Sequence, residues 1–225
     1  MKEKTKDIIE FLKIKYKWII LFLGLILFIE TLNNVFANEI MRRDVLGYEF
    51  ISKYLINDTI TPIAKFITWF GGVTGLIVIG IILTIVLRNK VIGFCIWINL
   101  GTIALINQIL KRLVQRPRPN EFRIIEETGY SFPSGHSMAS AAFYGFLIYL
   151  INKKLKNKKI KIALISALSI LIILIGMSRI YLGVHYTSDV YAGFAISISY
   201  LMIFTSIVGD YIDKPKGETN NSKEN

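Results

Sequence analysis

The chain carries at residues 178–189 the stretch SRIYLGVHYTSD, with a long apolar run on either side. Its Arg179, His185 and Asp189 are the only ionisable side chains, tyrosines aside, within residues 162–209. Charged groups at membrane depth are costly and usually mark a functional site. His185 and Asp189 are four residues apart, so on a helix they share a face, where a carboxylate fixes the imidazole tautomer and stabilises its cation. The stretch predicts a nucleophile or a base, against the alternative of a polar loop that caps a helix.

The composition indicates a membrane protein. The chain has 225 residues, is 53% hydrophobic and has a mean hydropathy of +0.50. Its apolar residues come in runs of about 20, the length that crosses the hydrocarbon core of a bilayer. We therefore expect an all-α integral membrane bundle of six transmembrane helices, at residues 18–37, 63–87, 91–110, 136–151, 162–177 and 190–208. Residues 38–61 fit a connector that contains an interfacial helix.

The basic residues predict the orientation of these helices. Of 27 lysines and arginines, 17 lie in the segments 1–17, 88–90, 152–161 and 213–225, which the positive-inside rule assigns to the cytoplasm. Both termini are then cytoplasmic. The expected organisation is a basic N-terminus at 1–17, a membrane domain at 18–212 and a disordered tail at 213–225. The loops at 111–135 and 178–189 share the extracytoplasmic face.

Composition also bears on other classes of protein. The net charge of +11 comes from lysines that flank apolar runs, which favours anionic lipid headgroups over nucleic acid as the partner. A single cysteine, Cys95, and two histidines argue against a disulfide, a metal site or any other bound cofactor. Val35, Phe36 and Ala37 resemble a signal-peptidase site, but Glu30 interrupts the apolar stretch, so an uncleaved anchor is favoured.

Two further motifs join the opening stretch. Lys111 begins the sequence KRLVQRPRP, which ends at Pro119, and residues 133–136 read PSGH. Together the three motifs resemble the signature of the type 2 phosphatidic acid phosphatase superfamily. That signature is Lys, six residues and Arg-Pro, then Pro-Ser-Gly-His, then Ser-Arg, five residues, His, three residues and Asp. All three parts match in order without a gap, from Lys111 to Asp189.

The resemblance implies a reaction and assigns residues to it. His185 would attack phosphorus, Asp189 would hold its ring, and His136 would protonate the leaving oxygen. The phosphate oxygens would be bound by Lys111, Arg118 and Arg179 and by the amides of Ser134 and Gly135. No metal would be required.

The residue types suit this chemistry independently of the family. A phosphate monoester carries nearly two negative charges, and arginine forks match its oxygens two at a time. Ser134 and Gly135 precede a helix, where exposed amides favour an anion, although Ser134 also suits an ordinary helix cap. For the other basic residues of the loop, Arg112, Arg116 and Arg123, we expect a solvated or headgroup-contacting position.

The expected substrate is a lipid phosphate or diphosphate in the membrane: phosphatidylglycerol phosphate, phosphatidic acid or undecaprenyl diphosphate. No protein partner is evident. Residues 129–132, GYSF, add to the resemblance to the broad lipid phosphatase branch. A transporter or flippase for a phosphorylated lipid is the main alternative, and it would tolerate loss of His185 better than loss of the arginines. The superfamily's vanadate-dependent haloperoxidases are soluble, which disfavours them here.

Overall fold

The computed structural model describes residues 2–37, 40–120 and 123–213, which form eight α-helices and no strand. The all-α class expected from the sequence is therefore confirmed over this part of the chain. The tail expected at 213–225 lies outside it, apart from Asp213. The helices are α1 (Lys2–Phe36), α2 (Arg42–Tyr54), α3 (Ile60–Trp69), α4 (Val73–Leu87), α5 (Lys90–Val114), α6 (Gly135–Lys154), α7 (Lys158–Tyr181) and α8 (Thr187–Asp213).

Most of the expected spans are present as long apolar helices. Within the described residues, four helical stretches are long and apolar enough to cross a membrane: Lys15–Phe36, Lys90–Val114, Lys158–Tyr181 and Thr187–Ile212. A fifth crossing arises if α3 and α4 act together. The protein is thus a multi-pass membrane protein. The remaining expected span, 136–151, corresponds to α6, which does not meet the same criterion, so the count of six stays a prediction.

The helix α6 is less apolar than these four helical stretches because it lies inside the bundle. Its neighbours are α5, α7 and α8, and much of its length is buried. Its buried surface includes Ser137 and Ser140 beside Phe143 and Phe146. A helix that faces protein rather than lipid can carry small and polar side chains, because packing replaces lipid contact. At Gly145, a Cβ atom would come within 2.4 Å of a methyl group of Leu201 on α8, so a larger residue there would require the Leu201 side chain to move.

The second expected span, 63–87, is not one continuous helix. It is divided into α3 and α4, which meet at an angle of 54°. Glycines at the break are a recognised cause of such kinks. Beside Gly71 and Gly72 lies the first turn of α6, because Cβ atoms built on either glycine would come within 3.5 Å of His136. The break therefore shapes the wall beside a predicted site residue.

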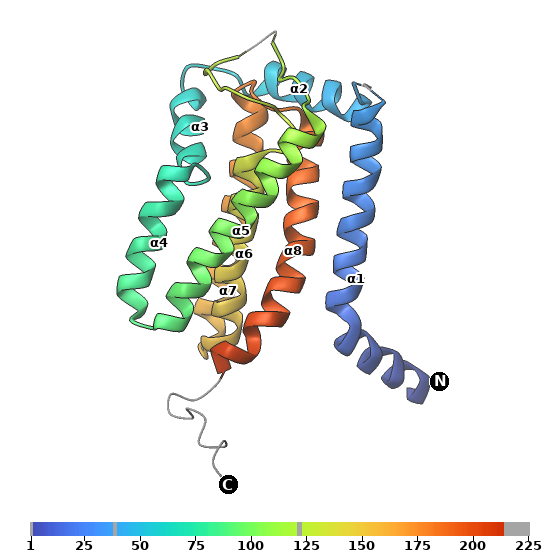
Figure 1. The fold of residues 1–225 in the computed structure, drawn as a ribbon, viewed down its shortest axis with the longest axis vertical. Helices are drawn as coiled ribbons and strands as arrows, with labels where there is room; N and C mark the ends of the chain where they lie inside the picture. The colour runs from blue at the N-terminus through green and yellow to red at the C-terminus, as the bar shows by residue number, and fades with distance from the viewer. Residues whose placement is uncertain (1, 38–39, 121–122, 214–225) are drawn as a thin grey trace.

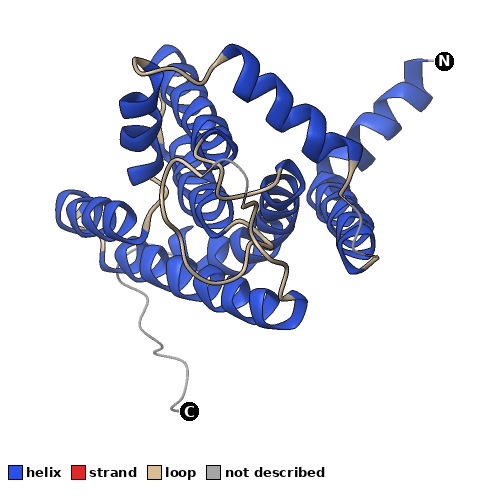
Figure 2. Cartoon of the chain, turned by 90° about the horizontal axis from the view of Figure 1, so that it is seen from above, coloured by secondary structure: helices blue, strands red, loops and turns tan. Residues whose placement is uncertain are grey.

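All the irregular segments with predicted site residues gather at one end of the bundle (Figure 1). The helix α2 lies across this end, roughly perpendicular to the bundle, and Figure 2 shows it between α1 and α3. The first turn of α1 and the last turn of α8 lie at the opposite end.

Candidate active site

The predicted site residues lie where five segments converge. Lys111 is in the last turns of α5, and Arg118 follows in the loop that leads to α6. Ser134 caps α6, and His136 is in its first turn. Arg179 ends α7, and His185 precedes α8. The expected loop at 178–189 is thus partly helical, because α7 and α8 extend into it from either side and leave a short connection at 182–186.

His185 and Asp189 form the pair predicted from their spacing, although His185 lies just outside the helix. Nδ1 of His185 is 3.4 Å from Oδ2 of Asp189. The same carboxylate oxygen accepts a hydrogen bond from the amide of Tyr186 at 2.9 Å. His185 is 3% exposed and Asp189 is completely buried. Burial lowers the pKa of His185 to about 4, despite the opposing effect of Asp189, so the imidazole is neutral at pH 7.

Arg118 contacts the other nitrogen of this imidazole. Its Nη1 lies 3.1 Å from Nε2 of His185 and donates to the carbonyl of Val184 at 2.9 Å. Its remaining donors reach the carbonyls of Gly129 and Thr128, both at 3.0 Å. The guanidinium is therefore fixed by three backbone carbonyls, with one edge directed at the predicted nucleophile.

Arg179 is 1% exposed and bound to two side chains. Its Nη1 donates to Oγ1 of Thr68 at 2.7 Å, and its Nη2 donates to Oε1 of Glu127. Its Nε is buried and has no hydrogen-bond partner among the described residues. Buried polar groups are usually paired, so an unpaired donor beside a predicted nucleophile is consistent with an anion-binding role.

Glu127 is a site residue that sequence reasoning missed. Its carboxylate bonds to Arg179 and lies 3.7 Å from Arg118, so it joins two predicted phosphate ligands. Burial acts to raise the pKa of Glu127, but the positive charges of Arg179 and Arg118 hold it below its usual value. The carboxylate is therefore ionised and balances two positive charges. It stands in a loop with no periodicity, where no sequence signal distinguished it from Glu126.

Lys111 and His136 complete the cluster. Nζ of Lys111 donates to the carbonyl of Tyr130 at 2.8 Å and is within electrostatic reach of Arg118 and Arg179. Likewise, His136 is within electrostatic reach of His185 and all three cations. The structure thus brings the predicted catalytic and basic residues into one region.

The start of α6 is built partly as predicted. Oγ of Ser134 accepts from the amide of Ser137, as a helix cap does. The amide of Ser134 itself donates to the carbonyl of Asp189 at 3.1 Å, so it is occupied within the protein. The first amides of a helix have no carbonyl of that helix to bond, which leaves those of Gly135 and His136 as the better anion donors. A Cβ on Gly135 would meet Oδ1 of Asn107 at 3.0 Å.

Arg116 was wrongly expected in a solvated or headgroup-contacting position. It is 9% exposed and forms two ion pairs, with Asp189 at 2.7 Å and with Asp44 at 3.0 Å. Its guanidinium also lies over the ring of Tyr186, 4.0 Å from the centroid. The prediction failed because it considered only distance from Lys111 along the chain. Asp44, which is buried on α2, was missed for the same reason.

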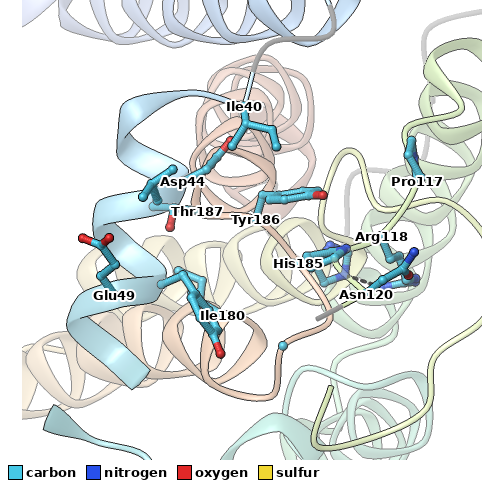
Figure 3. Close-up of a pocket in the computed structure, with 14 residues that line it drawn as sticks. Ile40, Asp44, Glu49, Pro117, Arg118, Asn120, Ile180, His185, Tyr186 and Thr187 are labelled. Atoms are coloured by element: carbon cyan, nitrogen blue, oxygen red, sulfur yellow. Dashed lines mark hydrogen bonds between the residues drawn. The ribbon is translucent and has the colours of Figure 1, made fainter. Parts of the chain in front are cut away.

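A cavity of about 530 Å³ lies between α2 and the loops of the site. Figure 3 shows Asp44 and Glu49 on one side of it and Arg118 and His185 on the other. Lys111, His136 and Arg179 are not part of its lining. The cavity thus leads to one edge of the basic cluster, at the imidazole of His185. Among the described residues, no group of three or more His, Cys, Asp or Glu side chains is placed to hold a metal ion.

Comparison with known proteins identifies relatives of this chain. Phosphatidylglycerophosphatase B of Bacillus subtilis (strain 168) is 37% identical over 119 residues, which cover 52% of this chain and 57% of that protein. Undecaprenyl-diphosphatase of Sulfolobus acidocaldarius is 26% identical over 200 residues, covering 84% and 90%. Several curated relatives are matched over only about half of their own length.

The fold is similar to a solved one. The crystal structure of a transmembrane PAP2 type phosphatidylglycerolphosphate phosphatase from Bacillus subtilis superposes with a TM-score of 0.69 at 27% identity, over 86% of this chain and 98% of that chain. A model of the PAP2 superfamily matches residues 91–213, which is more than half of the chain and includes every predicted site residue. The chain therefore belongs to the PAP2 superfamily.

Proposed function

We propose that the protein is a membrane lipid phosphatase that hydrolyses a phosphomonoester or diphosphate of a lipid through a phosphohistidine intermediate. The observation that carries this proposal is the environment of His185. One nitrogen of the imidazole faces the Asp189 carboxylate, and the other faces Arg118 at the edge of a basic cluster. A neutral imidazole with one nitrogen held by a carboxylate presents a lone pair on the other, which is the requirement for attack on phosphorus.

In the first step, Nε2 of His185 forms a bond to phosphorus, and the bond from phosphorus to the ester oxygen breaks. His136 gives its proton to that oxygen, so the lipid leaves as an alcohol, or as a monophosphate from a diphosphate. The imidazole becomes positively charged, and Asp189 stabilises this charge. Lys111, Arg118, Arg179 and the amides of Gly135 and His136 stabilise the negative oxygens.

In the second step, water attacks the phosphohistidine, with His136 as the base that accepts its proton. The bond from phosphorus to Nε2 breaks, and phosphate leaves. Three cations neutralise the phosphoryl group in this scheme, so no step requires a metal ion. Arg118 and His185 both line the cavity, and we infer that the phosphate group reaches the nucleophile through it.

We propose a site on the extracytoplasmic side, both termini in the cytoplasm and a sixth crossing by α6. The positions of the site and the termini support this arrangement, because α1 begins and α8 ends at the end of the bundle opposite the site (Figure 1). For the substrate, the names of the similar proteins suggest phosphatidylglycerol phosphate and undecaprenyl diphosphate as the first compounds to test.

The test is phosphate release by the purified protein in detergent with EDTA present. The panel is phosphatidylglycerol phosphate, phosphatidic acid and undecaprenyl diphosphate, and the relative rates identify the preferred substrate. In the His185→Ala variant, release should fall at least about 10³-fold, because loss of a nucleophile removes most of the rate enhancement. The melting temperature should change little. An equal rate in this variant would overturn the assignment of the nucleophile, and binding without release from any substrate would favour a transporter.

A further inference from the structure

Arg116 lies between two buried carboxylates from different helices. Its Nη1 donates to Oδ1 of Asp189 and to Oγ of Ser188, both at 2.7 Å. Its Nη2 donates to Oδ2 of Asp44 at 3.0 Å. The side chains of Asp44 and Asp189 are at most 1% exposed and that of Arg116 is 9% exposed. Water therefore screens these ion pairs very little, and their geometry is closely defined.

The Asp189 carboxylate is held from two directions. Oδ1 accepts from Arg116, while Oδ2 accepts from the amide of Tyr186 and faces Nδ1 of His185. A carboxylate held by one oxygen alone could rotate about its last bond. With both oxygens bound, rotation would break strong charged hydrogen bonds, so Oδ2 remains directed at the imidazole.

The helix α2 supports this arrangement through Asp44. Oδ1 of Asp44 accepts from the amide of Ser188 at 2.7 Å, in the first turn of α8, where amides lack a partner within the helix. Its Oδ2 accepts from the hydroxyl of Ser188 at 2.9 Å as well as from Arg116. Asp44 thus fixes both the guanidinium and the helix that carries Asp189.

We propose that Arg116, held by Asp44, is a positioning residue that orients Asp189 and through it the nucleophile His185. The proposal rests on the proposed function, in which His185 attacks phosphorus. Groups that hold the partner of a reacting histidine typically change activity by about 10 to 100-fold when they are removed. Arg116 differs in this from Arg118, whose Nη1 faces Nε2 of His185, and from Arg179, whose buried Nε has no partner among the described residues. Both Nη atoms of Arg116 are instead directed at Asp44, Asp189 and Ser188.

The experiment compares Arg116→Met and the milder Arg116→Lys with Arg112→Met, which removes an exposed arginine four residues earlier. For each variant, kcat and KM are measured on the preferred lipid phosphate, and the affinity for vanadate is measured separately. We expect kcat to fall about 10 to 100-fold in Arg116→Met, with KM and vanadate affinity within about threefold of wild type. Lysine keeps the charge but has no fork to join two carboxylates, so Arg116→Lys should recover only part of kcat. Arg112→Met should match wild type.

The titration of His185 provides a readout that a structural role would not change. The charged groups that act on this imidazole include Asp189, Glu127, Arg118 and Arg179, and the titratable His136 is also within electrostatic reach. Without Arg116, the Asp189 charge is no longer offset, so the pKa of His185 should rise in Arg116→Met, as measured by NMR of labelled histidine. If Arg116→Met does not fold, Arg116→Lys and Asp44→Asn carry the same test.

The outcomes separate three roles. Lower kcat with a raised His185 pKa supports the positioning role. A loss of vanadate affinity would instead make Arg116 a phosphate ligand, and a lower melting temperature with unchanged kcat would make it structural; either result overturns the proposal. If wild type releases no phosphate from any substrate, the proposed function fails. The His185 titration then still decides whether Arg116 acts on the imidazole.

Discussion

Nη1 of Arg118 lies 3.1 Å from Nε2 of His185, the nitrogen that attacks phosphorus in the proposed mechanism. With Nδ1 protonated and facing Asp189, Nε2 carries a lone pair, and Arg118 donates a hydrogen bond to it. The guanidinium therefore occupies the position that a phosphoryl group needs. An arriving phosphate dianion is a stronger acceptor than a neutral imidazole, so it can draw the N–H of Arg118 to its own oxygens. This transfer frees the lone pair only when a substrate is in place.

His136 should matter according to the quality of the leaving group. In His136→Gln, we expect kcat/KM for a lipid phosphate to fall about 10²- to 10⁴-fold, because the leaving alkoxide lacks a proton donor. For p-nitrophenyl phosphate, whose leaving group needs no proton, the loss should be far smaller. The measurement is the ratio of the two rates in each protein. Equal losses for both substrates would show that His136 does not act as the general acid.

His185 should be neutral throughout the physiological range, since burial lowers its pKa to about 4. The chain has two histidines, so His136→Gln leaves one imidazole to follow by NMR. We expect its titration near pH 4. The unfolded chain takes up this proton at about pH 6.5, so the free energy of unfolding should decrease as the pH falls from about 6.5 to about 4. A titration at or above pH 6.5 would contradict this environment.

Glu127 should weaken anion binding, because its carboxylate engages both Arg179 and Arg118. Replacement by glutamine removes a negative charge close to the proposed phosphate position. We expect vanadate to inhibit Glu127→Gln at least about fivefold more strongly, from a Coulomb energy of about 1 kcal/mol even under full solvent screening. The matched control is Glu126→Gln, at an exposed neighbouring glutamate. Weaker inhibition in Glu127→Gln would show that the carboxylate chiefly orders the two arginines.

The orientation of the bundle can be tested by cysteine labelling, since Cys95 is the only cysteine of the chain and is 5% exposed. Asn120 lies in the loop at the site, and Lys156 lies in the connection between α6 and α7. In intact cells, a membrane-impermeant maleimide should label Asn120→Cys and spare Lys156→Cys. Permeabilised cells should label both. The reverse pattern would place the site in the cytoplasm.

The long apolar runs were enough to predict most of the helices, because burial in lipid requires continuous hydrophobic sequence. The ends of the helices were harder to predict from the sequence. The helix α5 continues to Val114 and α7 to Tyr181, so both extend past the apolar residues into the site. Polar residues remain helical there because they bond to neighbouring segments, as Lys111 does to the carbonyl of Tyr130. Such contacts are not visible in a single run of sequence.

Only part of the candidate site could be predicted from the sequence. His185 and Asp189 are near in sequence, and their spacing was informative. Glu127, Asp44 and the true position of Arg116 depend on contacts across the fold, since Asp44 and Arg116 are 72 positions apart in the chain. Each of these side chains looks like an ordinary surface charge when it is considered alone. The burial of Asp44 and Arg116 becomes apparent only when α2 is placed against α8, and the role of Glu127 only when its loop is placed against Arg179 of α7.

The bond from the Ser188 amide to Asp44 joins residues that are 144 positions apart. A ribosome makes α2 long before α8, so the proposed nucleophile His185 and its partner Asp189 are the last of the predicted site residues to be synthesised. Before that point, Arg116, Arg118 and Lys111 have been synthesised, but the negative charge of Asp189 is not yet present to offset their positive charges. The proposed active site is therefore complete only after the start of α8 has been made, and a chain that stops before α8 would contain the basic cluster without Asp189.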